Sequence, residues 1–495
     1  MKGGLRVSMS WLHTWTGLVC GWLVFAIFAT GTASVFKPEI GAWTRPVLAA
    51  QPDPDAGLQR AADAIRREHP DAVSFTVAPP DGRARDMESY WSDAKGVFGQ
   101  AWRDPATGAA VAGPATSGGE LFYRFHFELM APYPYGRLAA CLAAAFFVSA
   151  IVSGVITHKR IFADFFTFRP AKGGQRAWLD GHNVLGVLAL PFHLFIALTG
   201  VVTLITTFMP FGPVGAYGKD MAAFYADAEP ATAHLPAATG RAAPLAPIAP
   251  MAAAARASFH GDILRMTVDK PGDAAARVIF FRDNSGAVSK STQAAAFDGA
   301  TGALLSAPPP PGPAMATYEF LYGLHMAAFA GPALRWLYFL GGLSGCGLIA
   351  TGLVLWTVAR RRKLARPHLG FRLGEVLNAG VVMGMAMAVA GFFWACRLLP
   401  AGLADRPGAE RHVFLATLAA AILYSALRPQ RRAWAELASA AAVLFAGAPL
   451  VSALSGGRSL WRSAATGDLA MASVDLTLLA LGAGFAFIAA RAARS

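Results

Sequence analysis

The feature that most constrains this chain of 495 residues is a series of eight apolar runs, each near the roughly 20 residues that a helix needs to cross a bilayer. Backbone groups in lipid have no water to bond, so such runs are expected to be α-helical. Only 15% of the residues are charged, against about 25% in a typical soluble protein. The sequence therefore predicts an all-α polytopic membrane protein, with helices at 11–36, 136–157, 183–208, 334–358, 375–398, 411–427, 433–453 and 470–491.

Positive charge gathers in the short segments beside these runs. The net charge is +13, and if the eight runs cross alternately, the main cationic segments all fall on one side of the membrane. One minor exception, at 454–462, falls on the other side. Because cytoplasmic loops are enriched in Lys and Arg, both termini are predicted to be cytoplasmic, and no nucleic-acid partner is expected. The cationic segments are Lys2 with Arg6, 158–176, 359–372, 428–432 and the final "RAARS".

Two long polar segments fall on the outer side, and each has a helix-like stretch followed by short alternating strands. The turn signals "DPATG" and "DGATG" stand near their ends, so each segment is expected to form a small α+β domain. The predicted organisation is 1–36 helix, 37–135 outer domain, 136–157 helix, 158–182 cytoplasmic loop, 183–208 helix, 209–333 outer domain, 334–358 helix, 359–374 cytoplasmic loop and 375–495 a four-helix extension.

The first part of the chain contains an internal repeat. The run "LHTWTGLVCGWLVFAIFATG" (12–31) aligns without a gap with "GHNVLGVLALPFHLFIALTG" (181–200), which places His13 on His182 and Gly17 on Gly186. The segment "FYRFHFELMAPYPYGRL" matches "FLYGLHMAAFAGPALRW", which places His126 on His325 and, with one gap, Arg137 on Arg335. A unit of helix, outer domain and helix therefore occurs twice within 1–363. A first helix that is half of such a pair is not expected to be cleaved as a signal peptide.

Each repeat places one histidine at the cytoplasmic end of its first helix and one at the outer end of its second. If the repeats pack about a pseudo-twofold axis along the membrane normal, His13 faces His182 near the inner surface, and His126 faces His325 near the outer surface. Two neutral imidazoles from opposed helices at matched depth are the ligands of a six-coordinate haem. The pattern predicts two haems, one near each leaflet.

Glycines and arginines accompany these histidines. Gly17 and Gly186 lie four residues after their histidines and hence on the same helix face, where they leave room for a flat macrocycle. Taken alone, the glycines favour close packing between helices instead. Arg137 and Arg335 are candidates to pair with haem propionates, with snorkelling at the interface as an equal alternative.

Two further histidines leave the pairing open. His193 lies near mid-membrane without a counterpart in the other repeat, and it is a candidate alternative ligand or a polar group between the two cofactors. His158 ends the second helix and is a candidate competitor for the inner haem. The chain shows no spacing of three or four ligands, so zinc and copper explain the histidines less well.

The paired motifs "WLHTWTGL" and "LPFHLFIALTG", with "FHFEL" and "YGLHMAAF", resemble the PepSY-associated transmembrane proteins over about residues 1–365. The D-x-ATG turns look like those of PepSY domains. The resemblance implies a bacterial inner-membrane reductase that holds two haems b and passes electrons to a periplasmic ferric siderophore, releasing Fe(II) for uptake. The extension at 375–495 departs from the simplest family pattern.

The sequence does not identify the electron donor, and it is compatible with two other functions. No nucleotide-binding motif stands in a strand–helix setting, so quinol or a separate cytoplasmic reductase is the expected donor. One alternative function is a haem-free transporter or permease accessory, because repeats are common in transporters. The other is a scaffold whose outer domains bind a peptide or a partner protein.

Overall fold

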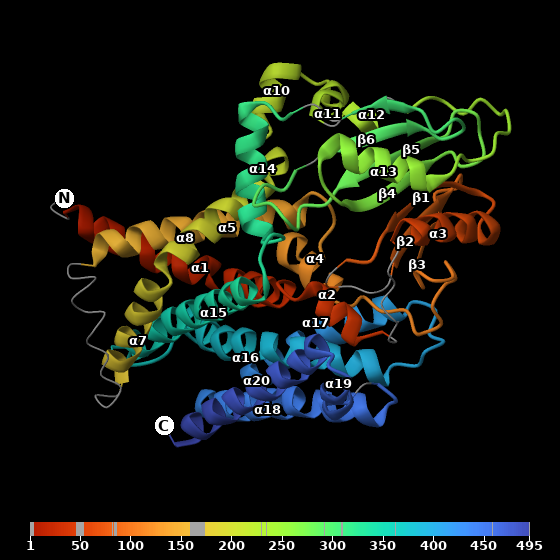
Figure 1. The fold of residues 1–495 in the computed structure, drawn as a ribbon. Helices are drawn as coiled ribbons and strands as arrows, with labels where there is room; N and C mark the ends of the chain where they lie inside the picture. The colour runs from red at the N-terminus through yellow and green to blue at the C-terminus, as the bar shows by residue number, and fades with distance from the viewer. Residues whose placement is uncertain are drawn as a thin grey trace. The chain divides into compact units, whose positions relative to one another are not determined.

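The computed structural model describes residues 4–45, 54–81, 83, 87–158, 174–228, 230–233, 235–291, 293–307, 310–361, 363–457 and 459–494. These residues form two compact units (Figure 1). The membrane unit comprises Met1–Arg45, Pro114–Phe208 and Gly331–Ser495, and the sheet unit comprises Pro46–Gly113 and Met209–Ala330. Most of the predicted cytoplasmic loop, at 159–173, lies outside the described residues, as does His234.

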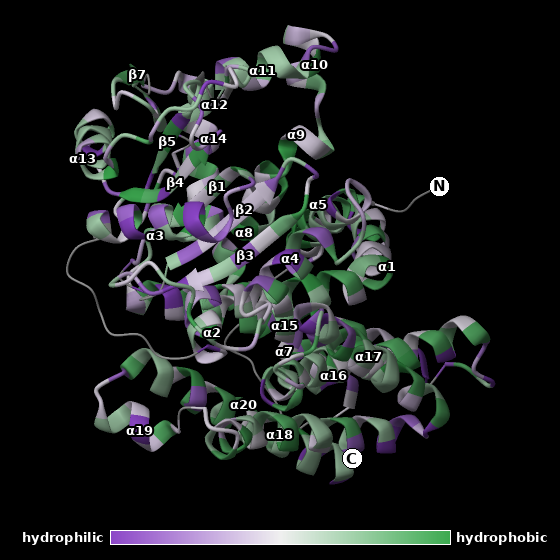
Figure 2. Ribbon diagram, turned by 90° about the vertical axis from the view of Figure 1, so that its right-hand side faces the viewer, coloured by the Kyte–Doolittle hydropathy of each residue, from purple (hydrophilic) through white to green (hydrophobic). Residues whose placement is uncertain are grey.

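Helices long and apolar enough to cross a membrane make up most of the membrane unit, and Figure 2 shows their largely hydrophobic colouring. Each covers one of the predicted runs, which supports a multi-pass membrane protein. Among the described residues they are α1 (Leu5–Ser34), α5 (Tyr135–Thr157), α15 (Pro332–Arg361), α16 (Leu369–Leu398), α17 (Arg406–Leu427), α18 (Gln430–Leu454) and α20 (Leu469–Arg494).

The run at 183–208, expected to be one helix, is broken in the structure. It forms α7 (Gly174–Leu188) and α8 (Leu190–Thr203), bent by 68° from each other, and then the short α9 (Ile205–Phe208). The cause is Pro191, which has no N–H to donate and whose ring clashes with the carbonyl four residues earlier. Ala189 at the break has a ψ of 21°, outside the helical range.

The C-terminal extension shares one hydrophobic core with the repeats. Helix α16 packs on α1 and α15 on one side and on α17 and α18 on the other, while α20 packs on α18. Phe392 and Phe393 of α16 contact Phe122, which lies on the short helix α4 (Glu120–Glu128). The extension is therefore built into the membrane unit. The remaining short helices of this unit are α2 (Lys37–Trp43) and α19 (Leu460–Ala465).

The sheet unit contains one antiparallel sheet of seven strands in the order β3-β2-β1-β4-β5-β6-β7. Strand β1 pairs with β4, and at the centre of that pair the hydroxyls of Thr76 and Thr267 are 2.9 Å apart. The two outer segments, predicted as separate domains, thus contribute to one sheet, because β1 and β4 would otherwise each leave an unpaired edge. The strands are β1 (Ala72–Ala78), β2 (Met87–Asp93), β3 (Phe98–Arg103), β4 (Ile263–Asp269), β5 (Arg277–Arg282), β6 (Ala294–Asp298) and β7 (Leu304–Ser306).

Helices α3 (Pro54–Glu68) and α13 (Ile248–Phe259) cover the same face of this sheet (Figure 1). Apolar side chains of both helices, such as Ile65 and Met251, form a single core with Phe75 and Phe280 of the strands. The two helix–strand segments therefore stabilise each other. The other helices of the sheet unit are α10 (Phe211–Tyr217), α11 (Met221–Ala228), α12 (Pro230–Ala233) and α14 (Pro313–Met326).

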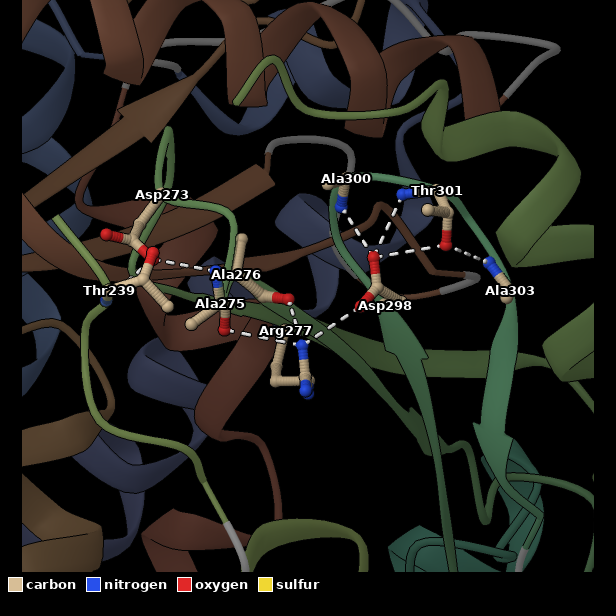
Figure 3. Close-up of polar contacts among 9 residues, drawn as sticks. All are labelled: Thr239, Asp273, Ala275, Ala276, Arg277, Asp298, Ala300, Thr301 and Ala303. Atoms are coloured by element: carbon tan, nitrogen blue, oxygen red, sulfur yellow. Dashed lines mark hydrogen bonds and ion pairs between the residues drawn. The ribbon is translucent and has the colours of Figure 1, made fainter. Parts of the chain in front are cut away.

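The two D-x-ATG motifs form matching turns, and Figure 3 shows the second. The carboxylate of Asp104 accepts a hydrogen bond from Ala106 N at 2.7 Å, and that of Asp298 accepts from Ala300 N at 3.1 Å. Each turn ends in a glycine with positive φ, +72° at Gly108 and +75° at Gly302, a conformation that glycine adopts without strain. The duplication seen in the sequence is thus repeated in the detailed geometry of the sheet unit.

Candidate functional site

A cavity of about 450 Å³ lies among the helices of the membrane unit. Its lining comes from α1, α5, α7, α8 and α15, which are the helices of the two repeats. Four histidines line it: His13, His158, His182 and His193. The predicted inner pair, His13 and His182, therefore shares one cavity with His158 and His193, the two histidines considered as alternative ligands.

His13 and His182 face each other in this cavity. Their ring centres are 6.1 Å apart and their planes are inclined by 64°. An imidazole nitrogen binds a metal at about 2 Å, and the ring centre lies roughly 1 Å farther, so two rings on opposite sides of one metal have centres roughly 6 Å apart. The separation of the ring centres would allow both imidazoles to hold a single iron.

The same hydrogen bond fixes each ring. Nδ1 of His13 is 2.8 Å from the carbonyl oxygen of Ala150, and Nδ1 of His182 is 3.0 Å from that of Leu348. A carbonyl only accepts, so each Nδ1 carries the proton and donates, and Nε2 keeps its lone pair. Among the described residues Nε2 of neither ring has a hydrogen-bond partner, and both are available to a ligand.

The supporting groups repeat at a fixed interval along the chain. Ala150 and Leu348 are 198 residues apart, as are Arg137 and Arg335 of the predicted alignment. The interval also relates Gly154 of α5 to Gly352 of α15. Both repeats therefore present their histidine to the cavity through an equivalent pair of helices.

Gly154 and Gly352 make this arrangement possible. A Cβ on Gly154 would lie 3.0 Å from Cε1 of His13, and one on Gly352 would lie 2.9 Å from Cε1 of His182. Each ring therefore packs directly on the backbone of the partner helix. These two glycines were not among the predicted site residues. The small-residue pairs "SG" (153–154) and "TG" (351–352), at equivalent places in the repeats, are the sequence signal that could have identified them.

The glycines singled out from the sequence also line the cavity. A Cβ on Gly17 would meet nothing within 4 Å, and one on Gly186 would meet only Cδ1 of Leu348 at 3.4 Å. Close helix packing, the alternative explanation, does not describe Gly17, whose surroundings are open. Its position fits a flat ligand beside His13.

His193 and His158 have less complete hydrogen bonding. His193 is fully buried on α8, and its Nε2 lies 3.4 Å from the carbonyl of Gly341, near the limit for a hydrogen bond. Nδ1 of His193 and Nδ1 of His158 are both buried without a partner in the described part of the chain. Neither ring is held by a carbonyl bond as short as those of His13 and His182, so the latter pair is better prepared for a metal.

The predicted outer pair is divided between the two units. His126 lies in the last turn of α4 in the membrane unit, where its Nδ1 is 2.8 Å from the carbonyl of Ile27 and its ring packs on Gly31 of α1. Burial lowers the pKa of His126, an effect partly offset by the hydrogen bond to Ile27. His325 lies in the last turn of α14 in the sheet unit. The pairing of His126 with His325 stays a prediction.

Arg137 and Arg335 each have a carboxylate partner inside the membrane unit. Arg137 is 3.3 Å from Glu128, and Arg335 of α15 is 3.0 Å from the nearly buried Glu39 of α2. The glutamates already supply the negative charge that propionates were expected to supply. The role of these two arginines toward a haem stays a prediction.

Two comparisons with known proteins agree with the repeat architecture. The sequence pattern described as the PepSY-associated TM region matches residues 10–359, which cover α5, α7 and α8 and all but the outermost residues of α1 and α15. An uncharacterized protein, PA4219, of Pseudomonas aeruginosa is 27% identical over 332 residues, covering 63% of this chain and 80% of that protein. The match to the family pattern extends over more than two thirds of the sequence. The chain therefore belongs to the PepSY-associated transmembrane family.

Proposed function

We propose that this protein is an inner-membrane haem b oxidoreductase that delivers electrons to a ferric siderophore on the periplasmic side. The observation that carries the proposal is the facing pair His13 and His182, 6.1 Å apart across a cavity and each oriented by an Nδ1–carbonyl bond. Haem b bound there would supply a one-electron iron couple within the membrane.

The protein's own contribution is positioning and exclusion of water. The carbonyls of Ala150 and Leu348 hold the two imidazoles in the tautomer that leaves Nε2 as the ligand atom. Gly17 and Gly186 keep the flanks of the cavity free of side chains. Apolar residues such as Leu18, Ile151 and Ile349 line its walls and keep the local dielectric low. His126 and His325 are the proposed ligands of a second haem b.

The proposed reaction releases iron because the siderophore binds its two oxidation states with different strength. Each electron delivered converts one chelated Fe(III) to Fe(II), and the hard oxygen ligands of a siderophore hold Fe(II) far more weakly, so the reduced iron is released. Quinol in the membrane or a separate cytoplasmic reductase is the proposed donor.

The visible spectrum of the purified protein tests the proposal. Protein from haem-replete cells should show a Soret band and, after dithionite, the sharp α and β bands of low-spin iron with two histidine ligands. His13→Ala and His182→Ala should each remove the same haem, while His412→Ala, which replaces an exposed histidine of α17, should remove none. A colourless wild-type protein, or equal haem content in all variants, would contradict the proposal.

The 68° bend between α7 and α8 favours a second candidate, a haem-free transporter or permease accessory. Transporters use broken helices to bind substrates at mid-membrane, and the fully buried His193 lies just after the break. This function predicts a colourless protein in which His193→Ala abolishes transport. The spectrum of the purified protein therefore separates the two candidates.

A further inference from the structure

The cavity that contains His13 and His182 has a cation at one end and mostly apolar side chains, with His193 beside Phe147, at the other. The direction follows from three helices that line it. On α15 the lining runs from Leu348 through Gly352 to Arg360, and on α5 it runs from Phe147 to His158. On α1, which runs the other way, Val24 lies at the apolar end and His13 toward the polar end. A ligand that matches the cavity is flat, apolar at one edge and polar at the other.

Arg360 is the cation at the polar end. Its guanidinium lies over the ring of Trp356, with 4.5 Å to the ring centre, and its Nη1 makes a long 3.4 Å contact with the carbonyl of Trp356. The structure describes no carboxylate paired with it. The neighbouring Arg361, in contrast, pairs with Glu375. The guanidinium of Arg360 can therefore donate hydrogen bonds to an anion that is not part of the described chain.

Arg360 is placed where it could bind an anionic group of a molecule held by His182. Gly352, which contacts the His182 ring, precedes Arg360 by eight residues, or about 12 Å along the helix axis. Long side chains of a helix lean toward its N-terminus, which directs the guanidinium back toward His182. His158, whose buried Nδ1 has no partner among the described residues, lines the same end and offers a second polar contact.

From these features we infer that Arg360, with His158, binds the carboxylates of the macrocycle held by His13 and His182. The inference rests on the proposed function and deepens it, because it selects a porphyrin with carboxylates on one edge and orients that edge toward the cavity end at Arg360. Guanidinium–carboxylate bonds are charge-assisted and frequently bidentate, which provides specificity as well as affinity. The apolar edge then faces Phe147 and Val24.

The test compares ferric haem b with its dimethyl ester, whose propionates are neutral. The intact chain carrying His126→Ala is purified from haem-deficient cells, so that the inner pair is the remaining predicted site, and each compound is titrated while the Soret band is recorded. The dissociation constants are measured with Arg360, with Arg360→Gln and with Arg361→Gln. Arg361→Gln is the matched control, because it removes a neighbouring arginine that does not line the cavity.

Protein with Arg360 should bind haem b roughly tenfold or more tightly than the ester, and Arg360→Gln should remove most of that preference by weakening haem b alone. Arg360→Lys should keep part of it, and Arg361→Gln all of it. An unchanged preference in Arg360→Gln would overturn the assignment but leave the proposed function intact. If protein with His13, His182 and Arg360 binds neither compound with a six-coordinate spectrum, the proposed function fails and the assignment fails with it.

Discussion

At the scale of single residues, the contact between each histidine and the glycine of the partner helix gives a sharp prediction. In Gly154→Ala the new Cβ would lie 3.0 Å from Cε1 and 3.1 Å from Nδ1 of His13, so the ring must rotate or move. Rotation weakens the bond to Ala150 and costs about 0.5–1.5 kcal/mol if the ring leaves its rotamer. The midpoint potential and the low-spin EPR signal of the inner haem should therefore shift, with less haem bound.

Gly352→Ala should have the same effect through His182, because its Cβ would lie 2.9 Å from that ring. Gly484→Ala provides the control, since it is also a helical glycine of the membrane unit but its Cβ would meet nothing within 4 Å. Redox titration of the three variants measures the effect. Identical potentials in all three would mean that the glycines do not position the ligands.

At this scale the sequence predicted the identity of the inner pair but not the groups that support it. The gap-free alignment of 12–31 with 181–200 was enough to place His13 opposite His182, because equivalent helices of a duplicated unit lie at equal depth. The carbonyl partners Ala150 and Leu348 could not be predicted, since a backbone carbonyl has no sequence signal. Arg137 and Arg335 were candidates for propionate pairing, with snorkelling at the interface as an equal alternative. Their partners Glu128 and Glu39 could not be predicted, because each lies in another helix than its arginine.

At the scale of elements, a single amide joins α16 to both repeats. Asn378 is buried, its Oδ1 accepts from Nε1 of Trp22 at 2.9 Å, and its Nδ2 donates to the carbonyl of Leu353 at 2.9 Å. Leu353 lines the histidine cavity. Asn378→Leu leaves the partly buried Nε1 of Trp22 without this acceptor and the carbonyl of Leu353 without this donor, and it should lower the unfolding free energy by about 1–3 kcal/mol.

Thermal unfolding in detergent measures this loss. The control is Ser473→Ala, which removes an exposed hydroxyl that bonds only to the backbone of its own helix, α20. The Asn378 variant should unfold at a lower temperature and also bind the inner haem less tightly. Unchanged unfolding and unchanged haem affinity would show that the extension is independent of the cavity.

The sheet unit offers a pH test at one loop. The Asp273 carboxylate accepts hydrogen bonds from Ala275 N at 2.7 Å and from Thr239 Oγ1 at 2.7 Å (Figure 3). It also accepts one from Gly240 N at 2.8 Å. These bonds hold the pKa of Asp273 well below its usual range. A carboxyl with a lowered folded-state pKa stabilises the fold above its unfolded pKa near 3.9, and the stabilisation disappears as pH falls below about 4.

Hydrogen exchange of the intact protein checks this prediction. Amides around 239–243 and 273–276, corrected for intrinsic rates, should lose protection below about pH 4. Asp273→Asn should lower their protection at neutral pH and remove the pH dependence, whereas Asp283→Asn, at the end of β5, should leave these amides unchanged. Equal pH dependence in the wild type and Asp273→Asn would contradict the role assigned to the carboxylate.

The sequence predicted the elements more completely than their association. Apolar length placed the spanning helices, and the D-x-ATG motifs placed the turns, because both are local signals. The bend at Pro191 was underestimated, since a proline in an apolar run either kinks a helix or is accommodated. That β1 pairs with β4 was not predicted, because strand partners almost 200 residues apart share no local pattern.

At the scale of the whole chain, the pairing of β1 with β4 constrains the membrane topology. The two strands belong to one sheet, so the segments that contain them lie on the same side of the membrane. Helix α5 crosses the membrane between these segments, and an even number of crossings must separate them. The bent pair α7 and α8 is therefore expected to return the chain as one span despite the bend. With the seven unbroken helices this predicts eight crossings and places both termini on the same side.

The cationic segments predict that this side is the cytoplasm, because Arg360 and Arg361 end α15 and Arg491 and Arg494 end α20, and cytoplasmic loops are enriched in Lys and Arg. Green fluorescent protein joined after Arg494 should fluoresce, because it folds in the cytoplasm. Alkaline phosphatase joined after Asp81 should be active, because it needs the oxidising periplasm. Moving the phosphatase to Lys363 should abolish its activity. A dark C-terminal fusion that is expressed at full length, together with an active fusion at Asp81, would mean that α7 and α8 do not cross. An inactive fusion at Asp81 would mean that the predicted orientation is reversed.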